Sequence, residues 1–293
     1  DSVHITSGRE FRINGLGDII IRKVALDEKS RIKPVALLAA IEQDKENGLI
    51  PAIVIASAGT TDTGAVDPLY DIGQICQSNN LWYHIDGAYG GFFILVDKIK
   101  DKFKGIEMAD SLVVDPHKGL FLPYGVGAVL VKDQEAVMHS HYYLANYMQD
   151  TLDESHVSSP MDLSPELTKH FRGMRMWLPL QLHGVEPFSA CLEEKLLLVE
   201  YFRSEIIKLG FNVGPNPDLS VSYFWYPKEQ MQNEYNQKLM NLMMEDGEIF
   251  FSSTTIKKKF VIRVAVLSFR TKINEIDRAI QMIKRVKLKL DNH

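Results

Sequence analysis

The chain contains 293 residues, of which 45% are hydrophobic and 24% charged, and its formal net charge is −5. Acidic and basic residues are interspersed along it, a pattern that gives no indication of binding to nucleic acid or to an anionic membrane surface. The longest uninterrupted apolar run, PVALLAAI, is far shorter than the ~20 residues that a membrane-spanning helix needs.

The first half of the chain alternates helix-like with strand-like segments. Helical spacing predicts a helix over residues 34–48, closed by Gly48, and another over residues 67–80, opened by Asp67 with Pro68 at its first position. Four short apolar runs predict buried strands: LIPAIVIASAGT, LWYHIDGAYGG, SLVVDPHKG and VGAVLVKD. Short buried strands separated by helices predict an α/β fold, in which a mostly parallel sheet carries helices on both faces.

Three polar residues fall at the ends of these predicted strands. Thr60 follows the first strand, Asp86 lies near the end of the second, and Lys118 follows the third. In open sheets of this kind, ligands bind beyond the carboxyl ends of the strands. The sequence therefore predicts a binding site at this edge of the sheet.

The second half of the chain begins with a change of character. Residues 139–165 are polar and lack a clear period, which is typical of a functional loop. The next segment, SPELTKHFRGMRMWLPLQLHG, predicts a helix with Ser164 as its N-cap and Gly184 at its far end. Such a helix would place Arg172 and Arg175 on one face.

The remaining residues predict a smaller α+β unit. A long amphipathic helix, EPFSACLEEKLLLVEYFRSEIIKLG, leads into it. The pattern then reads strand, helix, two strands and a final helix: LSVSYFWYP, residues 229–245, EIFFSSTT, KFVIRVAVLSF and residues 273–288.

A lysine and an aspartate at neighbouring strand ends suit one cofactor well. Pyridoxal 5'-phosphate needs an amine for a Schiff base and an acidic partner that keeps its pyridine nitrogen protonated. Lys118 would supply the amine and Asp86 the acid. From these two residues alone, the alternative is that Lys118 extends into solvent and Asp86 caps a turn.

The motifs around these residues carry a resemblance. HIDGAYGG, DPHKGLFLPYG and SAGTTDTGAVDPL, together with SPELTKHFRGMRMWLPLQLHGV and IRVAVLSFRT, resemble the pyridoxal-phosphate-dependent group II amino acid decarboxylases. The resemblance covers nearly all of the chain and implies the aspartate aminotransferase-like fold, fold type I of the pyridoxal-phosphate-dependent transferases. Residues 1–185, with a mobile loop at 139–165, would then be the C-terminal part of the cofactor-binding large domain, and residues 186–293 a small C-terminal α+β domain.

The resemblance also implies roles for individual residues. Lys118 matches the Schiff-base lysine and Asp86 the partner of the pyridinium, while Ala88 matches a small side chain against a ring face. His117 matches a histidine near the cofactor phosphate, unless it is a core histidine bonded to the backbone. Thr60 matches a hydroxyl near the ring substituents, with ordinary capping of the strand end as the alternative.

Three further residues stand at positions that have a known counterpart in the family. His4 matches a histidine stacked over the cofactor ring. Tyr143, with Tyr142 as its neighbour and rival, matches the tyrosine of the mobile loop, which in the family is thought to return a proton after CO2 departs. Asp115 stands where many members of the family carry Asn beside the phosphate. A carboxylate would repel phosphate there, so we expect Asp115 to cap the turn instead.

The resemblance implies decarboxylation of an L-amino acid to an amine and CO2 through a Schiff base at Lys118. Motif similarity favours an aromatic substrate, with Tyr89, Phe92 and Phe93 as candidate apolar walls, although core packing explains these three residues equally well. Glutamate, 2,4-diaminobutyrate and cysteine sulfinate stay open. Two alternatives also stay open: oxidative deamination to an aldehyde, which Tyr143 disfavours, and a catalytically incomplete chain with a structural role.

Assembly and location are the last expectations. In the family, a phosphate-binding segment and a dimer-forming region lie upstream of the residue matched by His4, so the resemblance implies that this chain is roughly the C-terminal two-thirds of a longer polypeptide. It also implies a homodimer. The two cysteines, Cys76 and Cys191, lie far apart and outside metal-ligand spacing, which predicts reduced thiols in a cytoplasmic protein without a metal site.

Overall fold

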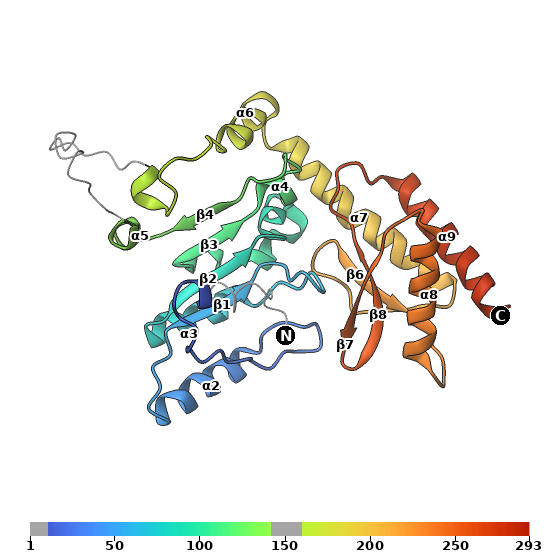
Figure 1. Cartoon of the computed structure of the whole chain (residues 1–293), viewed down its shortest axis with the longest axis horizontal. Coiled ribbons are helices and arrows are strands. Elements are labelled where there is room, and N and C mark those ends of the chain that lie inside the picture. The colour runs from blue at the N-terminus through green and yellow to red at the C-terminus, as the bar shows by residue number, and fades with distance from the viewer. Residues whose placement is uncertain (1–10, 142–159, 293) are drawn as a thin grey trace.

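The computed structural model of the chain describes residues 11–141 and 160–292. These residues form two four-stranded sheets, with strand orders β1-β2-β3-β4 and β5-β6-β8-β7. In Figure 1 the first sheet lies on the left and the second on the right, and the long helix α7 (Glu186–Lys208) runs diagonally from near α4 along the second sheet. None of the helices in the described part of the chain combines the length and apolarity needed to cross a bilayer.

The first sheet is mostly parallel, as predicted. Strands β1 (Ile53–Ser57), β2 (Trp82–Gly87) and β3 (Ser111–Val114) run parallel to one another. Strand β4 (Ala128–Val131) pairs with β3 in the antiparallel direction. The carboxyl ends of β1, β2 and β3 therefore meet at one edge, where the sequence predicts the site.

Helices and short 3-10 turns connect these strands. The α-helices are α2 (Pro34–Glu46), α3 (Leu69–Asn79), α4 (Pro116–Gly119), α5 (Gln134–His141) and α6 (Met174–His183). The 3-10 turns are η1 (Gly91–Leu95), η2 (Asp97–Phe103), η3 (Ile106–Met108) and η5 (Pro160–Leu163).

The two faces of the first sheet differ. On one face Val54, Ala56, Tyr83 and Ile85 are buried in a core that includes apolar residues of α2 and α3. The opposite face, which carries Asp86, lines a cavity. The expectation of helices covering both faces is therefore wrong for the described residues, because the side chains of the second face meet a cavity rather than a long helix.

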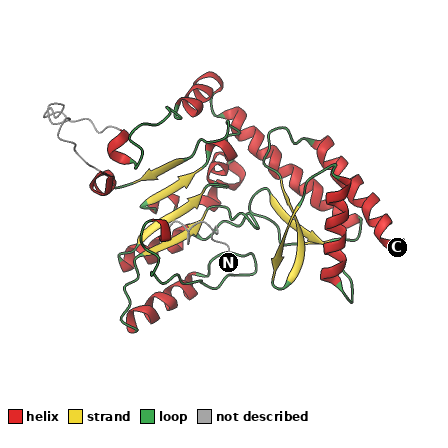
Figure 2. Ribbon diagram, viewed as in Figure 1, coloured by secondary structure: helices red, strands yellow, loops and turns green. Residues whose placement is uncertain are grey.

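The second sheet is antiparallel and packs against helices. Its strands are β5 (Asn212–Val213), β6 (Val221–Trp225), β7 (Ser252–Ile256) and β8 (Lys259–Ala265), and its helices besides α7 are α8 (Gln232–Asp246) and α9 (Ile273–Asp291). Figure 2 shows α8 and α9 on the side of this sheet that is turned away from the first sheet. Their apolar faces enclose Phe202, Phe224 and Ile262 in a second core.

Two predicted helix starts are wrong. Helix α6 begins at Met174, and the Ser164 hydroxyl donates to the carbonyls of Pro160 and Glu166 instead of capping a helix. Arg172 therefore precedes the helix and shares no helical face with Arg175. Helix α3 begins at Leu69 without a side-chain cap.

Asp67 has a different role from the predicted cap. Its buried carboxylate accepts hydrogen bonds from the backbone N–H groups of Ile32 and Ser57, at 2.7 and 2.8 Å. These bonds tie the segment before α2 to the end of β1. The Asp67 carboxylate therefore bonds to backbone N–H groups of distant segments instead of capping the helix that follows it.

The predicted loop 139–165 lies largely outside the described residues. Residues 139–141 are the last residues of α5, and residues 160–163 form η5. The domain boundary between residues 185 and 186 stays a prediction.

Candidate active site

Four of the predicted site residues line one cavity. Thr60, Asp86, Ala88 and Lys118 reach it from the carboxyl ends of β1, β2 and β3, together with Asp115. Its volume is about 630 Å³, within the range of roughly 300–1,000 Å³ that is typical of small-molecule sites. The other lining residues are Phe11, Asn14, Leu16, Ile53, Ile55, Ser57, Gly59, Thr61, Trp82, His84, Tyr89, Ser111, Val113 and Val129.

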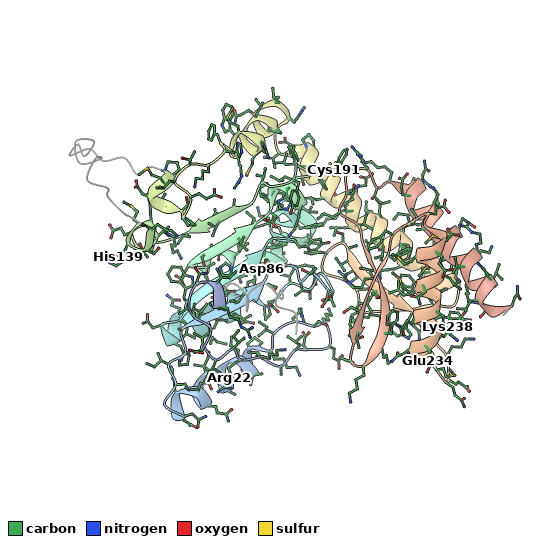
Figure 3. The ribbon with its side chains drawn as sticks, in the orientation of Figure 1. Arg22, Asp86, His139, Cys191, Glu234 and Lys238 are labelled. Atoms are coloured by element: carbon green, nitrogen blue, oxygen red, sulfur yellow. The ribbon has the colours of Figure 1, made fainter. Side chains whose placement is uncertain are left out.

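Strand β2 positions Asp86 through its alternation. Asp86 lies between Ser57 of β1 and Val113 of β3, so it occupies an interior strand of the sheet. Its backbone carbonyl accepts from Ala58 N–H at 2.8 Å, and its Oδ1 accepts from Ala88 N–H at 3.0 Å. The first bond holds the backbone at the end of β2, and the second fixes the direction of the carboxylate. Figure 3 labels Asp86 near the middle of the molecule, whereas the labelled His139 and Glu234 lie at its periphery.

Small residues bring the loop after β2 against the loop after β1. A Cβ on Gly90 would collide with the carbonyl oxygen of Ala58 and with Cδ1 of Leu219. Glycine is required there by close approach of the two backbones. This packing holds Ala88, which follows Asp86 by two residues, on the wall of the cavity.

Lys118 lies in α4, the single turn that follows β3. Its Nζ is 2.6 Å from Oδ2 of Asp115, and its side chain is 40% exposed. Asp115 makes no side-chain hydrogen bond to the start of α4, so the expectation that it caps the turn is wrong. The lysine amine attracts the carboxylate more strongly than the neutral backbone N–H groups do.

His117 bonds to the backbone beside the cavity. Its Nδ1 lies 2.7 Å from the carbonyl oxygen of Val126, and because a carbonyl only accepts, Nδ1 carries the proton. The ring of Tyr124 packs edge-on against it, with centroids 5.1 Å apart. His117 is absent from the cavity wall, and its contact with a cofactor phosphate stays a prediction.

Thr60 is buried, and its hydroxyl already has partners. Oγ1 accepts from Ala65 N–H at 3.2 Å and lies 2.8 Å from Oγ1 of Thr63. These bonds close the turn after β1. Thr60 therefore lines the cavity and shapes the loop, and its position near the substituents of a cofactor ring stays a prediction.

Two predicted residues cannot be placed. His4 and Tyr143 lie outside the described residues. Their roles stay predictions.

Of the three aromatic residues considered as apolar walls, only Tyr89 is among the residues that line this cavity. Tyr89 lines the cavity, and its hydroxyl lies 2.6 Å from Oγ of Ser220. Burial raises the pKa of Tyr89, so this phenol stays neutral at physiological pH. Phe93 is fully buried in the core and Phe92 packs against it, where it contacts Gly119.

Sequence reasoning missed a polar chain on the cavity wall. The indole N–H of Trp82 donates to Oγ of Ser111 at 2.8 Å, and Oγ of Ser111 lies 2.8 Å from Nδ1 of His84. Oγ of Ser111 can accept from the indole and either donate to or accept from Nδ1, so it links the two rings in either tautomer of His84. The signal was present: Trp82, His84 and Asp86 alternate along β2 and therefore share a face.

The fold and the cavity define an α/β protein with an amine and a carboxylate at adjacent strand ends. Residues 2–226 match the family described as the pyridoxal-dependent decarboxylase conserved domain. The chain belongs to this family. Its fold, fold type I of the pyridoxal-phosphate-dependent enzymes, agrees with the resemblance seen in the motifs.

Individual relatives agree with this assignment. The chain is 32% identical to an aromatic-L-amino-acid decarboxylase of Bacillus atrophaeus over 97% of its own length and 61% of the relative's. It is 26% identical to a phenylacetaldehyde synthase of Arabidopsis thaliana, over 97% and 60% of the two lengths. A crystal structure of Oryza sativa TDC with PLP and tryptamine superposes with a TM-score of 0.93 at 23% identity, covering 99% of this chain and 61% of that one. The chain thus spans about three fifths of the length of these relatives.

Proposed function

We propose that this chain forms part of an enzyme that decarboxylates an L-amino acid, with an aromatic substrate favoured, and that its cofactor is pyridoxal 5'-phosphate. The meeting of Lys118, Asp86, Ala88 and Thr60 at one cavity carries the proposal. Membership of the pyridoxal-dependent decarboxylase family supports it.

The residues present fit this cofactor. A primary amine and a carboxylate reach the cavity from different strand ends, and the small side chain of Ala88 leaves room beside Asp86. Lys118 would hold the cofactor covalently through its Nζ, and Asp86 would pair with the ring nitrogen. His117 and Thr60 would bind near the phosphate and the ring substituents.

Each residue then has a defined task. Bound pyridoxal phosphate would supply an electron sink for the electron pair that stays on the substrate when CO2 leaves. Asp86, held in direction by Ala88 N–H, would keep a proton on its partner nitrogen. Lys118 would be displaced by the substrate amine and would later displace the product amine, which requires that its ion pair with Asp115 open. Tyr143 and His4 are proposed to handle protons and to stack on the ring.

The walls of the cavity support an aromatic substrate. Ile55, Trp82, Tyr89 and Val113 present apolar surface to the same space as Asp86 and Lys118. Aromatic rings gain most from such walls, because a buried ring removes a large apolar area from water. The similarity to an aromatic-L-amino-acid decarboxylase points in the same direction.

Oxidative deamination to an aldehyde is the second candidate. The similarity to a phenylacetaldehyde synthase favours it, whereas Tyr143 favours decarboxylation. The nitrogen-containing product and the formation of peroxide separate the two. Decarboxylation yields CO2 and an amine, whereas aldehyde synthesis consumes oxygen and water and yields CO2, an aldehyde, ammonia and hydrogen peroxide.

The proposed assembly is a homodimer, and the proposed location is the cytoplasm. Exposed apolar side chains on strands at the edges of the first sheet, Ile53 on β1 and Val129 and Leu130 on β4, support a covering surface in the whole assembly. Burial raises the pKa of the Cys76 thiol to about 12, so it stays protonated, consistent with an inert reduced cysteine.

Borohydride trapping tests the cofactor assignment. The purified chain is mixed with pyridoxal phosphate, reduced and digested, and the modified lysine is located by mass spectrometry. We expect modification at Lys118, its loss in Lys118→Ala, and its retention in Lys132→Ala, whose lysine lies outside the cavity. Trapping elsewhere, or unchanged trapping in Lys118→Ala, overturns the assignment.

A panel of L-amino acids tests the reaction. We expect CO2 release from an aromatic member of the panel and none from Lys118→Ala. Release of CO2 together with an aldehyde, ammonia and peroxide, in place of the amine, would establish the aldehyde synthase. Cofactor trapping at Lys118 without any turnover would establish a chain that is incomplete for catalysis.

A further inference from the structure

The loop after β1 closes on itself and carries one wall of the cavity. In residues 59–66, Thr60 N–H donates to the carbonyl of Ala65 at 2.9 Å and Gly64 N–H donates to that of Thr60 at 2.8 Å. Thr61 and Asp62 form the tip of this turn. Thr60 and Thr61 both line the cavity.

Arg263 of β8 binds the tip of this loop from the second sheet. Its Nε donates to the carbonyl of Asp62 at 2.9 Å, and its Nη2 donates to the carbonyl of Thr61. The remaining nitrogen, Nη1, donates to Oγ of Ser252 on the neighbouring strand β7, at 2.8 Å. All three nitrogens of the guanidinium are engaged, so the rigid fork fixes both carbonyls at once.

The base of the loop fits tightly against β6 and the residues before it. A Cβ on Gly59 would lie 2.6 Å from Cδ1 of Leu219, and one on Gly64 would lie 3.1 Å from Cβ of Val221. Both glycines have positive φ angles, +110° and +70°. The loop can therefore take this shape only with glycine at both positions.

A second polar contact secures the end of the loop. Asp218, which is buried, accepts from Val66 N–H at 3.1 Å and pairs with Lys102 at 2.6 Å. Packing thus holds the base of the loop, and the carboxylate of Asp218 holds its end. The tip is different, since Thr61 is exposed and its carbonyl contacts Arg263.

We propose that Arg263 is a positioning residue for the candidate active site: it fixes the tip of loop 59–66 and so keeps Thr60 on the cavity wall. Without the fork, the carbonyls of Thr61 and Asp62 would bond to water, which does not select one shape of the loop. The expected effect on cofactor affinity rests on the proposed function. The inference that Arg263 fixes loop 59–66 does not rest on it.

Hydrogen exchange of the cofactor-free chain tests the holding of the loop. In Arg263→Met we expect the amides of Gly64 and Ala65 to exchange at least about tenfold faster, while α8 keeps its wild-type protection. Arg263→Lys keeps the charge without the fork, so its exchange rates in this loop should lie between those of the wild type and Arg263→Met. Arg278→Met, which removes an exposed arginine paired with Glu248, is the matched control and should exchange like wild type. Unchanged exchange in residues 59–66, or equal loosening of α8, overturns the proposal.

Titration with pyridoxal phosphate, monitored through the quenching of tryptophan fluorescence, tests the expected effect on cofactor affinity. Trp82 lines the cavity and serves as the reporter. We expect Arg263→Met to weaken cofactor binding about tenfold, Arg263→Lys less, and Arg278→Met not at all. A loosened loop with unchanged affinity overturns the role of Arg263 at the site. If the wild-type chain binds no cofactor, the proposed function fails, and exchange alone decides whether Arg263 holds the loop.

Gly64→Ala separates positioning from general stability. Alanine at this positive φ angle displaces the same loop by a different route. If Arg263 acts through loop 59–66, the losses of cofactor affinity in Gly64→Ala and Arg263→Met should not add in the double variant. Additive losses would show that Arg263 acts elsewhere and would overturn the proposal.

Discussion

Lys118 and Asp115 form an ion pair across the turn after β3, with Nζ 2.6 Å from Oδ2. Both residues line the cavity proposed for the cofactor. The pair must open before the lysine nitrogen can bond to a cofactor. The carboxylate that is left behind then faces a site that would receive an anionic phosphate. Asp115 therefore opposes cofactor binding in two ways.

Asp115→Asn should tighten the binding of pyridoxal phosphate. The amide keeps the shape of the side chain and removes the charge, so the lysine is released and the phosphate is no longer repelled. Because Lys118 is 40% exposed, solvent screening limits the gain to about three- to tenfold in affinity. Fluorescence titration measures it, with the exposed Asp101→Asn as control. Equal or weaker binding in Asp115→Asn would contradict this account.

The site could be predicted from sequence where local rules decide the structure. Apolar runs that end in Thr60, Asp86 and Lys118 gave parallel strands, and parallel strands place their carboxyl ends together. The alternation along β2 also contained His84. It was overlooked because a histidine on a half-buried strand has no specific signature.

Other features depend on contacts between distant segments, which local patterns do not contain. Asp67 has the sequence context of a cap but binds Ile32 and Ser57 N–H instead. Ser164 precedes a proline, as helix starts often do, yet α6 begins ten residues later at Met174. Arg263 reaches a loop some 200 residues earlier in the chain, a pairing that no spacing rule predicts.

Gly90→Ala should strongly destabilise the chain. A Cβ at this position collides with the backbone of Ala58 and with the side chain of Leu219, and the backbone contact cannot be relieved by rotating a side chain. Overpacking of this kind costs roughly 1–3 kcal/mol or more. Urea unfolding measures the loss. Gly17→Ala is the control, because a Cβ there meets only Cγ of Arg12 at 3.7 Å. Equal stability of both variants would contradict the packing argument.

Ser111→Ala should disturb the cavity wall through His84. The substitution removes the acceptor of the Trp82 indole and the partner of Nδ1 of His84. Loss of a buried hydroxyl with two partners costs on the order of 1–2 kcal/mol. Nitrogen chemical shifts of the His84 ring should show a changed tautomer ratio. Ser204→Ala, which removes one hydrogen bond from an exposed serine in α7, is the control. An unchanged His84 ring would contradict the proposed chain of hydrogen bonds.

The buried carboxyl of Asp67 should make stability depend on pH. Burial raises its pKa from 3.8 to about 6, although the N–H groups of Ile32 and Ser57 act in the opposite direction. Between these values the unfolded state loses the proton and the folded state keeps it, so stability is full below pH 3.8 and is lost as the pH rises through 6. From pH 4.5 to 7, the free energy of unfolding of the wild type should fall relative to Asp67→Asn by on the order of 2 kcal/mol. Urea unfolding at each pH measures the difference, with Asp71→Asn, exposed on the first turn of α3, as the matched substitution. A difference that stays constant or grows with pH would show that the two backbone N–H groups outweigh burial and keep this carboxylate ionised.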